Sequence, residues 1–235
     1  MDGNELSESV GSNSASRWRL RTRVLIAGGA LVAVLGSAAG IDVATRDRDH
    51  ESHVFESGVS SLDARISSGS LEVIGTDDPN ITIEVTTRGG LRGPKHSERV
   101  VGDQLELRSS CPLHLLTPSC SVDYVVRLPR NLDIVAHGNG SNITITSVAG
   151  SVDASSNGGA LDLRFAEAPY FVRGRSNGGR VAVELPRGDE FYRVDADSNG
   201  GKAKVEVRTD PASERQIDLH ANGGQVEVRY AEARS

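Results

Sequence analysis

The second half of the chain repeats one corner five times, at intervals of 18, 20, 22 and 23 residues. Self-similarity at a near-constant period indicates a repeat architecture, in which each unit buries its apolar face only against its neighbours. Asn followed by glycine tolerates a left-handed backbone and lets the chain reverse sharply. The five corners are Asn139-Gly140, Asn157-Gly158-Gly159, Asn177-Gly178-Gly179, Asn199-Gly200-Gly201 and Asn222-Gly223-Gly224.

Apolar and polar residues alternate on both sides of every corner, which is the period of a strand with one buried face. The positions five and three before the Asn, and four and six after it, are apolar or small in all five units. The positions between them are mostly charged or polar, and a second corner marked by Pro or Gly follows in most units. Each unit therefore reads as strand, Asn-Gly corner, strand and second corner.

This pattern predicts an all-β fold. Agreement between units at each position favours a single-stranded β-solenoid (β-helix) of about 20-residue coils, in which like residues stack on like. Asn-Gly between alternating runs is also a strong hairpin signal, so stacked β-hairpins or a sandwich stay open as the alternative. An aromatic content of only 4% suits a thin core of aliphatic side chains.

The N-terminal part of the chain has a different composition. A polar stretch with four arginines between residues 17 and 23 precedes an uncharged apolar run, which is long enough to span a bilayer at the lower limit. The arginines orient the N-terminus inside. We predict a short cytoplasmic end (1–23), one transmembrane helix (24–43), a linker (44–51) and an extracytoplasmic β-repeat domain (52–235). Small residues near Ala39 leave open a cleaved signal peptide and a secreted domain.

Cys111 and Cys120 are the only cysteines, and they bracket a short loop. In an exported domain such a pair predicts a disulfide. A metal or redox pair is the alternative, but His114 is the one histidine near the two cysteines in sequence.

The motifs do not indicate catalysis, and the net charge does not indicate nucleic-acid binding. The sequence has no nucleophile elbow, zinc-protease motif or phosphate loop. A net charge of −6 offers no basic field for nucleic acid. A column of Asp153, Asp195 and Asp218, interrupted by Arg173, reads as a solvated face, with a glycan-cleaving site as the alternative. We predict no enzyme and no catalytic, cofactor or metal site, including at the shared position of His137, Asp197 and His220.

Several motifs resemble a known family. Residues 68–73 read Ser-Gly-Ser-Leu-Glu-Val, the cysteine loop closes into Cys120-Ser121-Val122-Asp123-Tyr124, and residues 152–159 read Val-Asp-Ala-Ser-Ser-Asn-Gly-Gly. Together with the single N-terminal membrane segment, they resemble the bacterial putative-adhesin, or toast-rack, family of β-repeat domains. The resemblance covers about residues 55–230 and implies an exported β-solenoid without catalytic residues. Related domains are linked to envelope-stress signalling modules.

Two functions are consistent with these features. The first is a membrane-anchored, surface-exposed binding or scaffold module whose partner is a cell-wall polymer or an envelope protein. The second is an envelope-stress sensor that acts through partners of its inner segment. The strand edges at the end of a stack also predict self-association, with the tail from Arg229 onward blunting that edge.

Overall fold

The computed structural model describes residues 47–56, 58–89, 93–111 and 120–232, and it confirms the all-β prediction. In these ranges 17 strands form one nine-stranded and one eight-stranded sheet. The predicted cytoplasmic end (1–23) and transmembrane helix (24–43) lie outside the described residues. The described ranges themselves contain no helix with the length and apolar character that a membrane crossing needs.

Both sheets mix parallel and antiparallel pairs. In spatial order, the nine-stranded sheet contains β1 (Asp47–Phe55), β4 (Ile81–Gly89), β7 (Ser121–Pro129), β3 (Gly69–Thr76), β9 (Asn142–Val148), β11 (Leu161–Phe165), β13 (Val181–Leu185), β17 (Val226–Tyr230) and β15 (Ala203–Glu206). The eight-stranded sheet contains β14 (Arg193–Asn199), β16 (Gln216–Asn222), β12 (Phe171–Asn177), β10 (Val152–Asn157), β8 (Asp133–Asn139), β2 (Ser61–Ile66), β6 (Gln104–Ser110) and β5 (Lys95–Val101).

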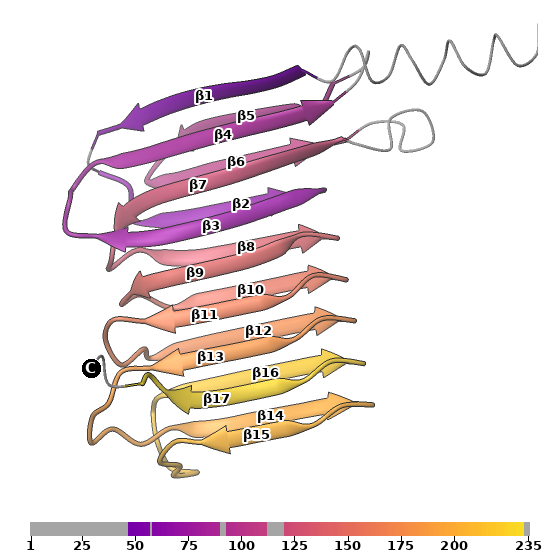
Figure 1. The fold of residues 1–235 in the computed structure, drawn as a ribbon. Helices are drawn as coiled ribbons and strands as arrows, with labels where there is room; N and C mark the ends of the chain where they lie inside the picture. The colour runs from indigo at the N-terminus through magenta and orange to yellow at the C-terminus, as the bar shows by residue number, and fades with distance from the viewer. Residues whose placement is uncertain (1–46, 57, 90–92, 112–119, 233–235) are drawn as a thin grey trace, which may run out of the picture. The chain divides into compact units, whose positions relative to one another are not determined.

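Each of the five Asn-Gly units places its first strand in the eight-stranded sheet and its second strand in the nine-stranded sheet (Figure 1). The two strands of a unit therefore do not pair with each other, so these units are not hairpins. Neighbouring units stack in parallel and in register, with Asn157 opposite Asn139 on one side and Asn177 on the other. Residues at the same position of stacked units therefore lie side by side, which is why the units resemble one another position by position in the sequence.

The core lies between the two sheets and consists of aliphatic columns. Val152, Leu161, Val172 and Val181 are fully buried, as are the equivalent residues of most other units. Burying a Val, Leu or Ile side chain stabilises a fold by roughly 1.5–3 kcal/mol, so the columns dominate the stability of the stack. The sheets approach closely enough that a Cβ added to Gly174 would lie 2.9 Å from Val181 Cγ1.

The last unit in sequence is not the last in space. Strands β16 and β17 lie between the β12/β13 and β14/β15 units (Figure 1). The expectation that the C-terminal tail covers the final edge is therefore wrong, because β14 and β15 form that edge. The physical reason lies in the side chains. The inner unit has Ile217, Leu219 and Val226 at positions where the end unit has the smaller Val194, Ala196 and Ala203.

Part of the final edge is covered. The Tyr192 N–H donates to the Arg208 carbonyl at 3.1 Å, and the Asp210 N–H donates to the Tyr192 carbonyl at 3.0 Å. Residues 208–210 thus satisfy the backbone at the start of β14, as natural proteins commonly protect sheet edges. No observation tests self-association, which stays a prediction.

Residues 47–51, predicted as part of a linker, form the first half of β1. This strand pairs antiparallel with β4, with Glu51 opposite Val85 and Phe55 opposite Ile81. Charged residues suit this position because the strand is at the edge of the sheet and Glu51 faces solvent. The charge pattern that indicated a linker therefore belongs to an edge strand.

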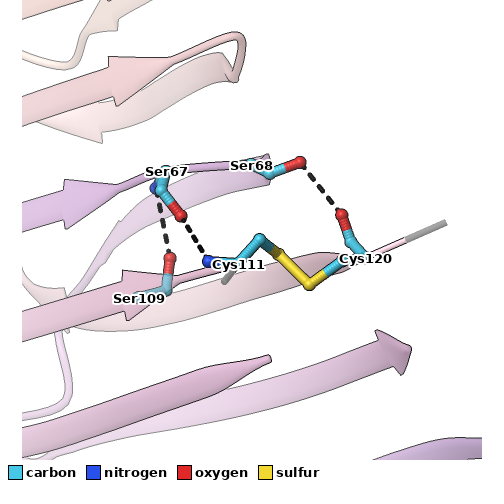
Figure 2. Close-up of a disulfide and its surroundings, with 5 residues drawn as sticks. All are labelled: Ser67, Ser68, Ser109, Cys111 and Cys120. Carbon is cyan, nitrogen blue, oxygen red and sulfur yellow. Dashed lines mark hydrogen bonds between the residues drawn. A yellow bond between two sulfur atoms is a disulfide. The ribbon is translucent and has the colours of Figure 1, made fainter. Parts of the chain in front are cut away.

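The predicted disulfide between Cys111 and Cys120 is present. It bridges the two ends of the connection between β6 in one sheet and β7 in the other. In the later units an Asn-Gly corner makes the equivalent connection. Figure 2 shows both ends of the loop bound to the neighbouring turn: the Cys111 N–H donates to Ser67 Oγ at 3.1 Å, and Ser68 Oγ donates to the Cys120 carbonyl at 3.1 Å. The disulfide thus fixes an otherwise long corner onto the stack.

Removing this disulfide is predicted to destabilise the stack. A closed loop with a sequence separation of 9 restricts the unfolded chain by about 2–3 kcal/mol. We expect the Cys111→Ser, Cys120→Ser double variant to lose that much free energy of unfolding in urea titrations. A loss below about 0.5 kcal/mol would contradict a stabilising role.

The second glycine of the four Asn-Gly-Gly corners is predicted to tolerate no side chain, because the neighbouring backbone leaves no space. A Cβ on Gly179 would overlap the backbone carbonyl of Gly159 in the next corner. We expect Gly179→Ala to reduce the free energy of unfolding by about 2–3 kcal/mol, since neither backbone can move alone.

Gly93→Ala is the matched control, because an added Cβ there meets no atom within 4 Å. Its effect should stay within about 0.5 kcal/mol. Equal effects of the two substitutions in urea titrations would show that close stacking of the corners is not the constraint.

Candidate functional site

The Asn-Gly corners form one continuous edge of the stack. In the corner after β10, Gly158 has φ +93°, and the corresponding glycine of every other unit is also left-handed. The buried Ser156 hydroxyl donates to the Ser141 carbonyl of the adjacent corner at 2.6 Å and accepts from the Gly159 N–H at 3.1 Å. Each such serine thus closes its own turn and joins it to the next.

The asparagine side chains form a hydrogen-bonded ladder along this edge. Asn177 Nδ2 donates to Asn157 Oδ1 at 2.7 Å, and Asn222 Nδ2 donates to Asn177 Oδ1 at 2.7 Å. Asn199 Nδ2 continues the series by donating to Asn222 Oδ1 at 3.0 Å. Four amides therefore face the same way, and bonds of this kind polarise one another.

A column with basic side chains runs beside the ladder, two residues before each Asn on the outer face of the eight-stranded sheet. The strand registers place Arg65, His137, Ser155, Arg175 and His220 in consecutive rows. Adjacent rows are about 4.8 Å apart, the spacing of paired strands. The ring Nδ1 of His137 hydrogen-bonds to Ser155 Oγ at 2.7 Å, which orients both side chains.

These two columns line a groove of about 670 Å³. Its charged or titratable lining residues are two arginines and two histidines, with no acidic residue among the described side chains that line it. Amides and hydroxyls supply most of the remaining polar lining. The lining includes Arg65, His137, Arg175, His220, Asn139, Asn157, Asn177, Asn222, Ser67, Ser109, Ser155 and Ser156.

Asp197 occupies the row next to His220 in the basic column, and the other acidic residues of this face lie one column further from the corners. Arg173 separates two of them, at 3.3 Å from Asp153 and 3.2 Å from Asp218. Asp195 lies opposite Asp218 in the next row. Arg173 binds Asp153 and Asp218, and Asp195 and Asp218 are neighbours on one sheet face rather than across a cleft, so this column fits a solvated face.

One histidine of the groove has a clearly perturbed pKa. The Asp197 carboxylate hydrogen-bonds to His220 Nδ1, and this bond raises the pKa of His220 above its usual value, with a further contribution from Asn222. His220 therefore keeps its positive charge to a higher pH than an unperturbed histidine. No group of three or more His, Cys, Asp or Glu side chains suited to a metal ion occurs in the described part of the chain.

The sequence analysis located the corners but missed the groove. All five predicted corners join the two sheets, with Ser141 in place of the second glycine in the first unit. The shared position of His137 and His220 was visible, but Arg65 belongs to a unit without an Asn-Gly corner. Aligning Arg65-Ile66-Ser67 with the later units would have been the only sequence signal for the full column.

Known proteins resemble this chain in structure but not detectably in sequence. No family model and no curated protein matches it. The crystal structure of a "putative cell adhesion protein" from Clostridium sporogenes has a TM-score of 0.56 at 11% identity, and the match covers 79% of this chain and 100% of that one. A "putative adhesin" from Bacteroides fragilis has a TM-score of 0.33 at 12% identity, with 77% and 97% covered. The resemblance to putative adhesins is thus confirmed at the level of the fold.

Replacing Asp197 is predicted to lower the pKa of His220. The raised pKa means that the imidazolium stabilises the folded state below the usual histidine pKa, and that this contribution is lost as pH rises through the raised value. We expect Asp197→Asn to return the pKa of His220 toward 6.5, as measured by NMR titration of the ring. The same substitution should remove the pH-dependent contribution of His220 to the stability of the folded state.

Asp153→Asn serves as the control, because it removes a carboxylate that does not contact His220. It should leave the His220 titration unchanged. An unchanged titration in Asp197→Asn would mean that the Asp197–His220 bond does not form in solution.

Proposed function

We propose that this chain is a membrane-anchored, surface-exposed binding or scaffold module that performs no catalysis. The observation that carries the proposal is the groove, in which side chains from successive units lie in rows along one face. Stacked repeats are well suited to binding extended partners, because one unit after another offers the same kind of contact. The fold shared with the "putative cell adhesion protein" from Clostridium sporogenes supports this assignment by analogy.

In this proposal the described strands form a β-solenoid ectodomain held at the bacterial membrane by residues 24–43, with residues 1–23 inside. The disulfide supports an oxidising environment outside the cytoplasm. The alternative is that the domain is secreted after cleavage near Ala39. The proposed partner is a cell-wall polymer or an envelope protein.

A second candidate function is the sensing or regulation of envelope stress. It is supported by the Arg-rich stretch of residues 17–23, which would lie at the inner face of the membrane and could contact a partner there. In this candidate function regulation acts through another protein that contacts the inner segment.

Cross-linking of the intact chain in its own cells distinguishes the two functions. A binding module should be purified together with wall polymer or a surface component, and deleting residues 1–16 should not change that recovery. Recovery of membrane kinases or stress proteins instead, together with a stress-reporter response altered by the same deletion, would favour the regulator. Absence of any wall or surface component would contradict the binding proposal.

A further inference from the structure

We propose that the groove binds an anionic polymer, carrying phosphodiester or carboxylate groups, through two arginine–histidine pairs, Arg65 with His137 and Arg175 with His220. This inference rests on the proposed binding function and assigns its ligand class. Each pair occupies two adjacent rows of the same column, and Ser155 fills the row between the pairs.

The charge of the groove differs from that of the protein. The whole chain has a net charge of −6, yet the groove is lined by two arginines and two histidines and by no acidic side chain of the described residues. Exposed guanidinium groups on an acidic protein attract anions locally.

Carboxylates hold the two arginines in place, and each of these carboxylates also binds a second arginine. Arg65 Nε lies 3.5 Å from Asp63, and Arg108 lies 3.0 Å from the same carboxylate. Arg175 and Arg173 likewise share Asp218, at 3.3 and 3.2 Å.

Each of these carboxylates is therefore divided between two guanidinium groups. The side chains of Arg65 and Arg175 are 60% and 54% exposed, so N–H groups of both remain open to solvent. A guanidinium has five N–H donors in a planar fork that matches phosphate and carboxylate oxygens.

The spacing of the pairs fits an extended ligand. Arg65 and Arg175 are three rows apart, and the same separation holds between His137 and His220, which corresponds to roughly 14 Å. A polymer that crosses the strands along the stack would place one anionic group at each pair. Ser155 and the neighbouring Asn157 amide lie beside its path.

The Asn ladder adds donors at the first pair. Asn157 accepts from Asn177 and donates its own amide hydrogens to no described side chain, so the ladder ends in N–H groups beside His137. At the second pair Asp197 raises the pKa of His220 but balances its charge from the next row, so Arg175 supplies the positive charge there. Among the described residues that line the groove there is no Trp, Tyr or Phe on which a neutral sugar ring could stack, so these residues offer charge and hydrogen bonds.

The test measures binding of the full chain, kept in a neutral detergent, to three polymers by isothermal titration calorimetry. Poly(glycerol phosphate) supplies phosphodiesters, polygalacturonate supplies carboxylates, and dextran is the neutral control. We expect both polyanions, or one of them, to bind with an affinity that falls as salt rises, and dextran not to bind. Binding of only one polyanion would identify which anionic group the groove prefers.

The substitutions Arg65→Gln and Arg175→Gln, made together, should weaken polyanion binding about tenfold or more, because each removes a charge-assisted hydrogen bond. Arg164→Gln with Arg180→Gln is the matched control on the outer face of the nine-stranded sheet. Those side chains are 53% and 50% exposed, and each lies beside one carboxylate. The control should change the affinity less than about twofold, and both double variants should keep the wild-type melting temperature.

Three outcomes would overturn the inference: no binding of either polyanion, equal weakening by the two double variants, or dextran binding as tightly as the polyanions. If the chain still binds isolated cell wall in any of these cases, the proposed binding function stands and only the ligand class or the groove is wrong. If the chain binds no wall material either, the proposed function fails as well.

Discussion

Backbone packed directly on backbone at the Asn-Gly corners is the constraint on which the rest of this structure depends. The second glycine of one corner lies against the carbonyl of the next, with no room for a side chain between them. The buried hydroxyls of Ser156 and Ser176 donate hydrogen bonds to backbone carbonyls of the adjacent corner. Because the corners can stack only in this way, the register of every strand in the repeat is fixed, and with it the columns of the core and the surface.

Because the register is fixed, equivalent residues of successive repeats line up and form one extended surface. A residue two positions before the corner contributes little alone, but five rows of such residues make a column beside the asparagine ladder. The column does not depend on identical sequence in every unit, since Arg65 enters it from a unit without an Asn-Gly corner. Substitution at single rows therefore changes the surface chemistry of the groove while the backbone stays the same.

The sequence predicted the parts of this fold that depend on periodicity. Alternation about each Asn gave the strands and their buried faces, and agreement between units indicated parallel stacking. Local patterns could not predict the order of the units, because a strand such as β12 presents the same kind of edge to β14 as to β16. The size of the core residues decides that order: Ile217 and Leu219 gain more from an inner position than Val194 and Ala196 do.

The candidate site was harder to predict than the fold. The sequence placed His137 and His220 at one position of the repeat, but it could not show that Arg65 aligns with them across the irregular first half. Nor could it show which carboxylates face the groove. The linker prediction failed for a related reason, since a charged edge strand such as β1 and a charged linker have similar composition. In both cases the missing information was the tertiary pairing of strands.

The order of the units is tested most directly by cysteine cross-linking on the outer face of the nine-stranded sheet. Ala182 in β13 lies opposite Glu227 in β17, and Lys204 in β15 lies on the far side of Glu227. Neighbouring positions are about 4.8 Å apart and permit a disulfide, whereas positions two rows apart, at roughly 9.6 Å, do not. The account predicts that Ala182→Cys with Glu227→Cys forms a disulfide and that Ala182→Cys with Lys204→Cys does not. The reverse result would mean that the units stack in sequence order, which would place Arg175 beside Asp197 instead of His220 and separate the second arginine–histidine pair.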